Sequence, residues 1–373
     1  MLNKIKRFIA SEHLLRVDAL YLVALSGGAD SVALLLCLKE LGYCVEAVHC
    51  NFNLRGEESL RDEQFCEDLC QRENIPLHKV HFDTQAYADL HKVSIEMAAR
   101  DLRYRYFFQL KEALSADGVC VGHHKEDSVE TILINLVRGT GLSGLMGIRP
   151  RNHDVIRPLL CVTRQEIEDY LYQHAVSFVT DSTNLIDDVV RNKIRLNVLP
   201  QLSEINPSVT DAILTTANHL SEVDAIVQES LKEALGKAVS FINSANQVSS
   251  NSLSNEPFQL DLSVVRAFPS PSYLLFYILK PLGFSSSQIA EMVSHLDGQT
   301  GQLWYSSSHE VTHYRGVFMV LPREKTEPRQ LVIPETGCYV YDEQLSLRLT
   351  ERALIPSSNV SFSKVPTVVD LDA

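Results

Sequence analysis

A regular alternation of short apolar runs with longer amphipathic segments constrains the fold of this chain more than any other feature. It extends from Tyr21 to about Val179. Four of the apolar runs have the length of buried strands, and polar residues follow each of them: 21–25, 45–50, 77–82 and 119–122. The segments between them have helical spacing. Because strands that alternate with helices form a parallel sheet of βαβ units, the sequence predicts an α/β domain.

The expected helices of this domain cover residues 31–41, 58–73, 94–114 and 127–138. A fifth helix is expected to begin at Thr163, because Glu166 follows three residues later and the pair forms a capping box before apolar positions with helical spacing. Beyond Asn206 a long helical segment runs to about residue 235, and a Ser/Asn-rich stretch near 243–257 is typical of a linker.

The rest of the chain predicts helices around 273–279 and 287–296, a hairpin from 303–305 and 311–321, and short strands after residue 330. A length of 373 residues is enough for two or three domains. We therefore expect an α/β domain over 1–215, a smaller, mainly helical domain over 216–325, and an incomplete C-terminal β-containing domain over 326–373.

Composition restricts the cellular context. The chain contains no apolar stretch of the roughly 18 residues that a membrane span needs, and its charged N-terminus is unlike a signal peptide, so a cytoplasmic protein is expected. The eight cysteines lie mostly in apolar runs and are expected to be reduced core residues. A net charge of −13 excludes a surface covered in phosphate-binding cations, but basic residues gather locally within 100–105, 138–164 and 191–195.

The sharpest motif is Ser26-Gly27-Gly28-Ala29-Asp30-Ser31, which lies between the first strand and the first helix. Glycines and a helix N-terminus bring backbone N–H groups close to an anion, so this turn is suited to phosphate. It has neither the lysine of a Walker A loop nor the spacing of a dinucleotide-binding loop. Because a carboxylate would repel phosphate unless a divalent cation lay between them, Asp30 predicts a Mg²⁺–nucleotide site.

Two further groups of candidate site residues are two histidines at the ends of predicted strands and two acids on the helix that follows the fourth strand. His49 and His123 lie at the edge of the sheet where ligands bind in open α/β folds, and we expect them to contact the nucleotide. A zinc site at His123 and His124 is the alternative, and it lacks cysteines at metal-binding spacing. Asp127 and Glu130 share a helix face, where they either compensate the helix dipole or hold an ammonium group.

The loop sequence resembles the signature of the pyrophosphate-loop ATPases, which cleave ATP between the α- and β-phosphates and adenylate a substrate oxygen. Within that superfamily the chain resembles the tRNA(Ile)-lysidine synthetases. The matching stretches are VHCNFNLRGEES, IEMAARDLRYRYF, VGHHKEDSVETILINLVRGTGLSGLMGI, RPLL, and DSTN followed by RNKIRLNVLP. The resemblance is close over about residues 20–215 and weaker beyond them.

The resemblance implies an adenine nucleotide α-hydrolase-like fold, ATP and Mg²⁺ as cofactors, a helical tRNA-binding domain, and roles for particular residues. The catalytic residues would be Asp30, Arg100, Asp127, Glu130, Arg191 and Arg195. The nucleotide would be bound by Ser26, Gly27, Gly28, Ala29, Asp30, Ser31, His49 and His123. Asp127 and Glu130 would hold the substrate lysine, and Asp30 would hold the metal. The glycine-rich segment 138–144 is expected to be an irregular basic loop, and tRNA contacts are expected from Arg138, Arg149, Arg151 and Arg164.

The implied activity is that of a carbon–nitrogen ligase. ATP would adenylate the carbon-2 oxygen of the wobble cytidine in the isoleucine tRNA with a CAU anticodon, and free L-lysine would then displace AMP. Two rivals stay open: another pyrophosphate-loop enzyme such as a tRNA thiolase, which would need a reactive cysteine pair, and a catalytically silent RNA-binding relative. The sequence does not set the oligomeric state, and a homodimer is compatible with it.

Overall fold

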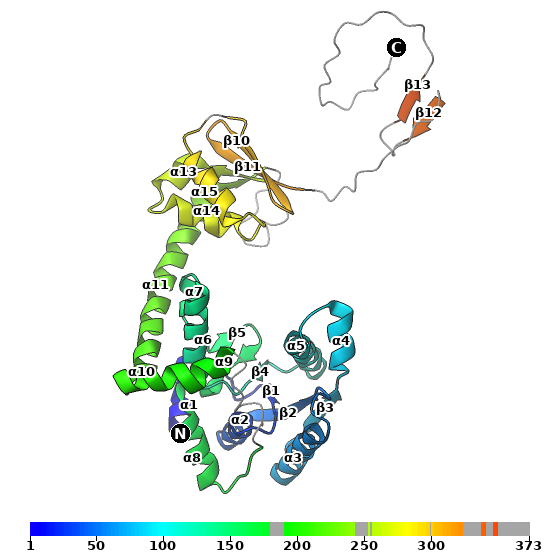
Figure 1. Cartoon of the computed structure of the whole chain (residues 1–373), viewed down its shortest axis with the longest axis vertical. Coiled ribbons are helices and arrows are strands. Elements are labelled where there is room, and N and C mark those ends of the chain that lie inside the picture. The colour runs from blue at the N-terminus through cyan, green and yellow to red at the C-terminus, as the bar shows by residue number, and fades with distance from the viewer. Residues whose placement is uncertain are drawn as a thin grey trace, which may run out of the picture. The chain divides into compact units, whose positions relative to one another are not determined.

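The computed structural model describes residues 1–179, 190–242, 253, 256–298, 300–323, 337–340 and 346–349 (Figure 1). The chain divides into two compact units, Met1–Gln228 and Glu229–Ala373. Helix α11 (Val209–Ala238) confirms the long helical segment expected after Asn206. The predicted domain boundary at residue 215 falls within this helix, and the division into three domains stays a prediction. None of the helices in the described ranges combines the length and apolarity that a membrane span requires.

A six-stranded sheet is the centre of the first unit. Its strands are β1 (Leu20–Ala24), β2 (Cys44–Asn51), β3 (Leu77–His81), β4 (Gly118–Cys120), β5 (Arg151–Asn152) and β6 (Val155–Ile156). Their order is β3-β2-β1-β4-β6-β5, and every pairing is parallel except that of β5 with β6. The four predicted strands are confirmed to within one or two residues at each end. The two-residue strands β5 and β6 have no sequence pattern that predicts them.

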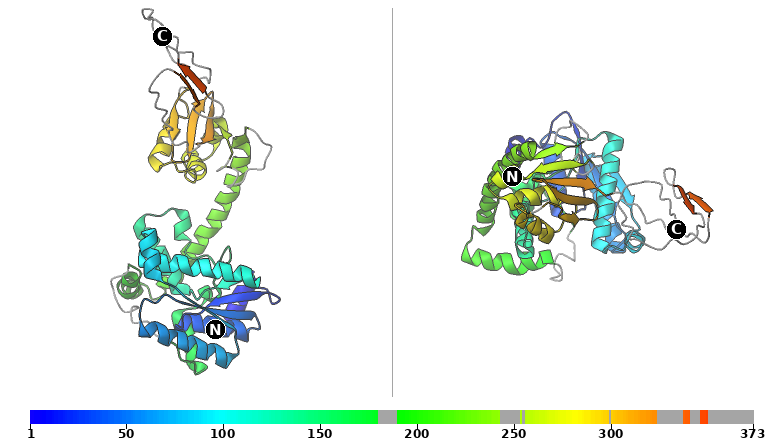
Figure 2. Two further views of the ribbon diagram at one scale, coloured as in Figure 1. Left: turned by 90° about the vertical axis from the view of Figure 1, so that its right-hand side faces the viewer. Right: turned by 90° about the horizontal axis from the view of Figure 1, so that it is seen from above.

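Helices cover both faces of this sheet (Figure 1 and Figure 2). The helical elements of this unit before α11 are α1 (Leu2–Ser11), α2 (Ala29–Glu40), α3 (Glu57–Glu73), α4 (Thr84–His91), α5 (Ile95–Leu114), α6 (Lys125–Arg138), α7 (Leu142–Leu145), η1 (Pro158–Cys161), α8 (Arg164–Gln173), α9 (Val190–Lys193), η3 (Ile194–Val198) and α10 (Leu199–Ile205). The predicted capping box begins α8: Thr163 Oγ1 accepts from the Glu166 N–H at 3.2 Å, and a Glu166 carboxylate oxygen accepts from the Thr163 N–H at 2.8 Å.

Successive side chains of β1 point to opposite faces of the sheet, so an apolar cluster forms on each face. Tyr21 and Val23 pack into the larger apolar cluster, which includes most of α2, whereas Leu22 points to the other face and packs with Phe107 of α5. Residues 32–38 of α2 are all buried, because this helix lies between the sheet and α8. The first and last residues of α2 are thereby fixed relative to the sheet.

The strand order reverses at β1. The chain proceeds from β1 to β2 and β3 on one side, and then returns to place β4 on the other side of β1. Ligands in open α/β sheets bind in the crevice that opens beyond the carboxyl ends of the strands at such a reversal. The Ser26–Ser31 loop follows β1, and the histidine-rich segment 122–125 follows β4, so both motifs lie at this crevice.

The described part of the second unit contains a five-stranded antiparallel sheet of order β7-β8-β11-β10-β9, and helices accompany it. Its elements are β7 (Val239–Phe241), β8 (Phe258–Asp261), α13 (Leu262–Ala267), α14 (Pro271–Leu279), α15 (Ser286–Ser294), β9 (Leu303–Tyr305), β10 (His309–Tyr314) and β11 (Val317–Pro322). The predicted helices correspond to α14 and α15. The segment 311–321 is two strands rather than one, because Arg315 and Gly316 both take positive φ and form a tight turn.

Of the predicted C-terminal domain, the described part is an antiparallel pair, β12 (Gly337–Val340) with β13 (Ser346–Leu349). Most of the predicted linker and the DSTN sequence lie outside the described residues.

Candidate active site

The Ser26–Ser31 loop is shaped by its own hydrogen bonds. Ser31 Oγ donates to the Gly28 carbonyl at 2.9 Å and accepts from the Ser26 N–H at 3.2 Å. Gly27 has a φ of +90°, a conformation that favours glycine, and it packs against α3. Gly28 is the N-cap of α2, so the N–H groups of the first turn lack partners within the helix and are available to an anion.

Asp30 lies in the first turn of α2, and its two carboxylate oxygens differ. Oδ2 accepts from Arg164 Nη1 at 2.7 Å. Oδ1 is buried and has no hydrogen-bond partner among the described residues, although His124 Nε2 is 3.9 Å away. Burial raises the pKa of Asp30, while His124 and Arg164 oppose that rise. A buried carboxylate oxygen without a partner fits a divalent cation, because Mg²⁺ binds through one or two carboxylates together with substrate phosphates.

Two adjoining cavities open beside the loop. The first has a volume of about 350 Å³, and its lining includes Ser26, Gly28, Asp30, Ser31, Arg100, Arg103, Tyr104, Gly122 and His123. The second, of about 400 Å³, is lined by Ser26, His49, Cys50, Asn51, Phe52, Leu54, Arg55, Ser59, Asp62 and Arg103. Of the predicted nucleotide-binding residues, Gly27 and Ala29 belong to the loop but line neither cavity. Ala29 instead packs into the core.

Several residues that line these cavities are not among the predicted site residues, and Arg103, Phe52 and Tyr104 stand out among them. Arg103 lines both cavities, and its guanidinium lies 5.1 Å from the centre of the Phe52 ring. Arg100 lies 5.0 Å from the ring centre of Tyr104, which lines the first cavity. Arg103 could have been found from the sequence, because it follows Arg100 by three residues and so shares its helix face. Phe52 and Tyr104 have no comparable signal.

The two predicted nucleotide-contacting histidines are in different environments. His49 Nδ1 lies 2.9 Å from the Leu25 carbonyl, and burial lowers the pKa of this histidine. His123 Nδ1 accepts from Arg157 Nε at 3.3 Å, and burial lowers the pKa of His123 to about 4. His123 is therefore uncharged at neutral pH and acts through hydrogen bonds. Across the described ranges no group of three or more potential ligands could hold a metal, so the zinc alternative has no support.

The predicted acids and arginines meet at one cluster. Glu130 is fully buried and accepts from Arg195 Nε at 2.6 Å and from Arg195 Nη2 at 3.0 Å. Arg191 Nε lies 3.6 Å from Glu130 Oε2. Asp127 Oδ2 accepts from the His124 N–H at 3.0 Å, and Arg195 Nη2 lies 3.5 Å from Asp127 Oδ1. Both carboxylates are thus already partnered, Asp127 as a helix cap and Glu130 by guanidinium groups.

The arginine side of this cluster lies next to an irregular turn. Arg195 is in η3, a single π-helical turn between α9 and α10, and such turns recur at functional sites. Burial raises the pKa of Glu130, while the hydrogen bond from Arg195 opposes that rise.

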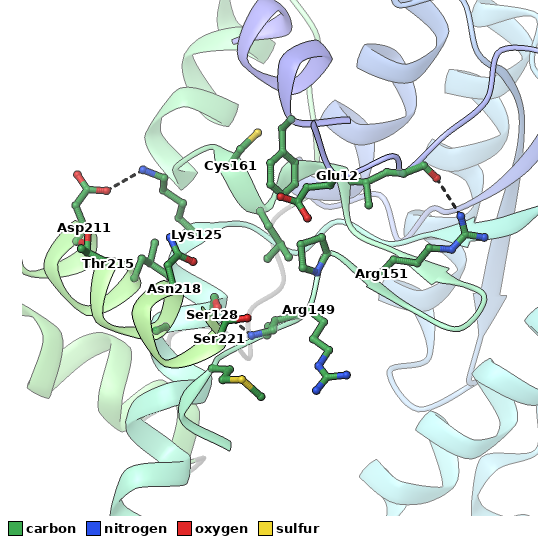
Figure 3. A pocket seen from close by; sticks show the side chains of 18 of the residues that line it. Glu12, Lys125, Ser128, Arg149, Arg151, Cys161, Asp211, Thr215, Asn218 and Ser221 are labelled. Atoms are coloured by element: carbon green, nitrogen blue, oxygen red, sulfur yellow. Dashed lines mark hydrogen bonds and ion pairs between the residues drawn. The ribbon is translucent and has the colours of Figure 1, made fainter. Parts of the chain in front are cut away.

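The four arginines expected to contact tRNA do not form one surface. Arg138 is exposed at the end of α6. Arg149 and Arg151 line a third cavity of about 950 Å³, and Arg151 is exposed (Figure 3). Arg164 is apart from them, because it is ion-paired with Asp30 at 2.7 Å and Glu168 at 2.7 Å. The segment 138–144, expected to be irregular, contains the start of the one-turn helix α7.

The third cavity lies between α1, α6, η1 and the part of α11 from Asp211 to Ala225, so its lining is within the first unit. Figure 3 shows Lys125 paired with Asp211, with 2.8 Å between Nζ and Oδ1. Arg151 Nη1 donates to the Leu14 carbonyl at 3.4 Å. Arg149 also lines this cavity.

The cysteines near the site do not have the reactivity that a thiolase would need. Cys50 lines both smaller cavities, and burial raises its pKa to about 12. Cys66 and Cys70 are buried on α3, and burial raises the pKa of Cys70 to about 11 and that of Cys66 still higher. Thiols with such pKa values are protonated at neutral pH and react poorly.

The fold and the loop define a pyrophosphate-loop protein, and a family model described as the PP-loop domain matches residues 1–202. A second model, described as the TilS substrate binding domain, matches residues 253–323. A tRNA(Ile)-lysidine synthase of Bacteroides thetaiotaomicron is 46% identical over 89% of this chain and 75% of its own length. A second, from Parabacteroides distasonis, is 44% identical over 90% of this chain and 74% of its own length. The chain belongs to the tRNA(Ile)-lysidine synthase family.

Among solved structures, the U34-tRNA thiolase NcsA from Methanococcus maripaludis matches with a TM-score of 0.50 and 16% identity, over 59% of this chain and 80% of that one. This similarity concerns the fold alone. The curated relatives support the lysidine synthase interpretation over the thiolase and over a silent RNA-binding relative, and the family implies use of ATP.

Proposed function

We propose that this chain catalyses both half-reactions of lysidine formation at the crevice between β1 and β4. In the first, the carbon-2 oxygen of the wobble cytidine in tRNA(Ile) with a CAU anticodon attacks the α-phosphorus of ATP, and pyrophosphate leaves. In the second, the ε-nitrogen of free lysine bonds to carbon 2, and the bond from carbon 2 to the adenylated oxygen breaks to release AMP. The observation that carries the proposal is a phosphate-suited loop whose Asp30 has a buried oxygen without a partner among the described residues.

The residues around the first cavity divide the work. The loop N–H groups and the start of α2 hold the phosphates, and Arg100 and Arg103 supply positive charge from elsewhere in the cavity lining. Asp30 would hold Mg²⁺, which when bound neutralises phosphate charge. His123, uncharged at neutral pH, is available as a hydrogen-bonding group beside the reacting atoms.

The cluster of Asp127, Glu130, Arg191 and Arg195 is our candidate for the lysine site. Free lysine carries a carboxylate and two ammonium groups, and this cluster combines two carboxylates with two guanidinium groups. A site with both charges present can match both ends of such a ligand. Since Glu130 is held by Arg195, lysine would bind by sharing these partners rather than by filling an empty acidic pocket.

The tRNA contacts proposed for the first unit are Arg138, Arg149 and Arg151, which are cations at its surface. The target base belongs to a single-stranded anticodon loop, so its extrusion into the site costs little stacking energy. Arg164 is better assigned to the loop, where it holds Asp30. A cytoplasmic location and a homodimer stay predictions.

The test is the mass of the nucleoside formed when the protein, ATP, Mg²⁺, lysine and total tRNA are incubated together. We expect a cytidine in which lysine nitrogen has replaced the carbon-2 oxygen, with one AMP and one pyrophosphate per nucleoside. A thiolated nucleoside would favour the thiolase alternative. Binding of tRNA without AMP release would indicate a silent relative.

A further inference from the structure

Helix α3 carries two buried acids, of which Asp62 lines the second cavity. Asp62 and Glu63 are only 5% and 7% exposed, although most of α3 is solvent-accessible. Buried carboxylates are costly unless they are paired, so both need a structural or functional reason. Neither takes part in the reaction described above.

Glu63 is fixed by three partners. Its Oε2 accepts from Asn51 Nδ2 at 2.8 Å, its Oε1 accepts from Lys79 Nζ at 3.1 Å, and His81 Nε2 lies 3.1 Å from Oε1. Burial would raise the pKa of Glu63, but the hydrogen bonds from Asn51, Lys79 and His81 outweigh it and lower the pKa to about 2. Glu63 is therefore charged at every physiological pH.

The nitrogen of the Asn51 amide is held mainly by Glu63, and it also lies 3.5 Å from the Ser59 carbonyl oxygen. Because Nδ2 is engaged by Glu63, Oδ1 faces the other way and accepts from the Asn53 N–H at 3.0 Å. Asn53 has a φ of +53°, and this hydrogen bond closes a turn that ends β2. Asn53 Nδ2 donates to the Phe82 carbonyl at 3.1 Å, which fastens the same turn to the end of β3.

This turn begins the loop of residues 51–56, and the loop forms one wall of the cavities. Phe52 lines both of them and packs on two groups: its ring centre is 5.6 Å from that of Phe82 and 5.1 Å from the guanidinium of Arg103. Arg55 lines the second cavity, and its Nη2 donates to Asp62 Oδ2 at 3.1 Å.

We propose that Glu63 is a positioning residue for the nucleotide pocket: through Asn51 it fixes the 51–56 loop, and thereby places Phe52 and Arg103 against the bound nucleotide. Glu63 does not line either cavity itself. The inference rests on the proposed function in one respect, namely that these cavities bind ATP.

Helix α3 offers a matched control. Glu67 lies one turn after Glu63 and also pairs with Lys79, but it does not contact Asn51. Glu63→Ala and Glu67→Ala therefore both remove a carboxylate from Lys79, and only Glu63→Ala releases the loop. We expect Glu63→Ala to weaken ATP binding by about tenfold, the typical effect of losing a hydrogen bond to a charged group. Glu67→Ala should bind ATP as the unsubstituted protein does.

Three measurements on each variant distinguish a positioning role of Glu63 from a purely structural one. They are a direct titration with ATP, the KM for ATP, and kcat. Positioning predicts that the KM for ATP rises for Glu63→Ala at a temperature where both variants are fully folded. A purely structural role predicts a lower unfolding temperature with an unchanged KM for ATP. If Glu63→Ala and Glu67→Ala bind ATP equally well, the proposal is wrong. If Glu63→Ala does not yield folded protein, Glu63→Asp replaces it, because the shorter chain keeps the charge and withdraws from Asn51.

An Asn51→Ala background supplies the second measurement. If Glu63 acts through Asn51, adding Glu63→Asp to Asn51→Ala should not weaken ATP binding further, whereas additive losses would refute the route. These titrations need no tRNA. Failure of the proposed function would appear as an unmodified nucleoside with the unsubstituted protein, and ATP binding would still decide the role of Glu63.

Discussion

Substitution of Gly122 by alanine tests whether β4 and the phosphate loop must approach each other as closely as the structure shows. Gly122 follows β4, and a Cβ at this position would lie 2.9 Å from the carbonyl carbon of Asp30, 3.0 Å from its oxygen and 3.1 Å from the Ser31 nitrogen. These atoms belong to the backbone of the first turn of α2, so no flexible side chain can move aside. The loop itself would have to shift.

The expected cost follows from that geometry. Overpacking at a rigid contact typically destabilises a protein by about 1–3 kcal/mol. In a unit of this size each kcal/mol lowers the unfolding temperature by about 2–4 °C. Because the atoms that move carry Asp30, ATP affinity should fall together with stability.

Thermal unfolding and ATP titration of Gly122→Ala provide the measurement, and Gly141→Ala is the control. Gly141 is in the same unit, has a φ of −79°, and an added Cβ there would have no atom of the described residues within 4 Å. We expect the control to change stability by less than about 0.5 kcal/mol. An unfolding temperature and ATP affinity for Gly122→Ala equal to those of the control would show that this approach does not set the position of the loop.

Three further outcomes are expected. Asp30→Asn keeps the shape of the side chain and removes its charge, so pyrophosphate release should be lost while circular dichroism stays unchanged; normal release would contradict the role of Asp30. Replacing Arg149 and Arg151 with Gln should weaken tRNA binding and reduce its salt slope by about one unit for each phosphate that is no longer neutralised, and an unchanged slope would assign both arginines to intramolecular interactions. Because the folded-state pKa of Glu63 is depressed to about 2 from 4.5, its contribution of about 3 kcal/mol is present above pH 4.5 and lost as pH falls toward 2. The difference in unfolding free energy between the unsubstituted protein and Glu63→Gln should therefore shrink over that range, and a constant difference would contradict the assignment.

The sequence predicts the parts of the site that are local. The loop before α2 and the capping box of α8 each have a signal within a few residues, and both are confirmed as local structures. The strands expected before His49 and His123 are confirmed as well, although β2 continues two residues past His49 and β4 ends three residues before His123. Arg100 and the loop serines also line the same cavity, as the order of the strands leads one to expect.

Pairings between distant segments have no such signal. The hydrogen bonds of Arg195 to Glu130 join residues 65 positions apart, and they convert a predicted ammonium site into a cluster of mixed charge. Likewise Arg164 lies in a basic stretch of the sequence, which predicts an RNA contact. In the structure α8 packs beside α2, and Arg164 is hydrogen-bonded to Asp30 instead. A charged residue can be recognised from sequence, whereas its partner depends on how the helices pack.

The reversal of strand order at β1 also determines when this site can exist during synthesis. β1 pairs with β2 after a short connection, but its pairing with β4 joins residues nearly 100 positions apart, Tyr21 with Gly118. Closing a loop of that length costs more chain entropy than any other step of the sheet, so the β4 edge forms late. Arg191 and Arg195 emerge from the ribosome later still. The phosphate loop is therefore translated early, whereas the pairing of Glu130 with Arg195 can form only after Arg195 has left the ribosome.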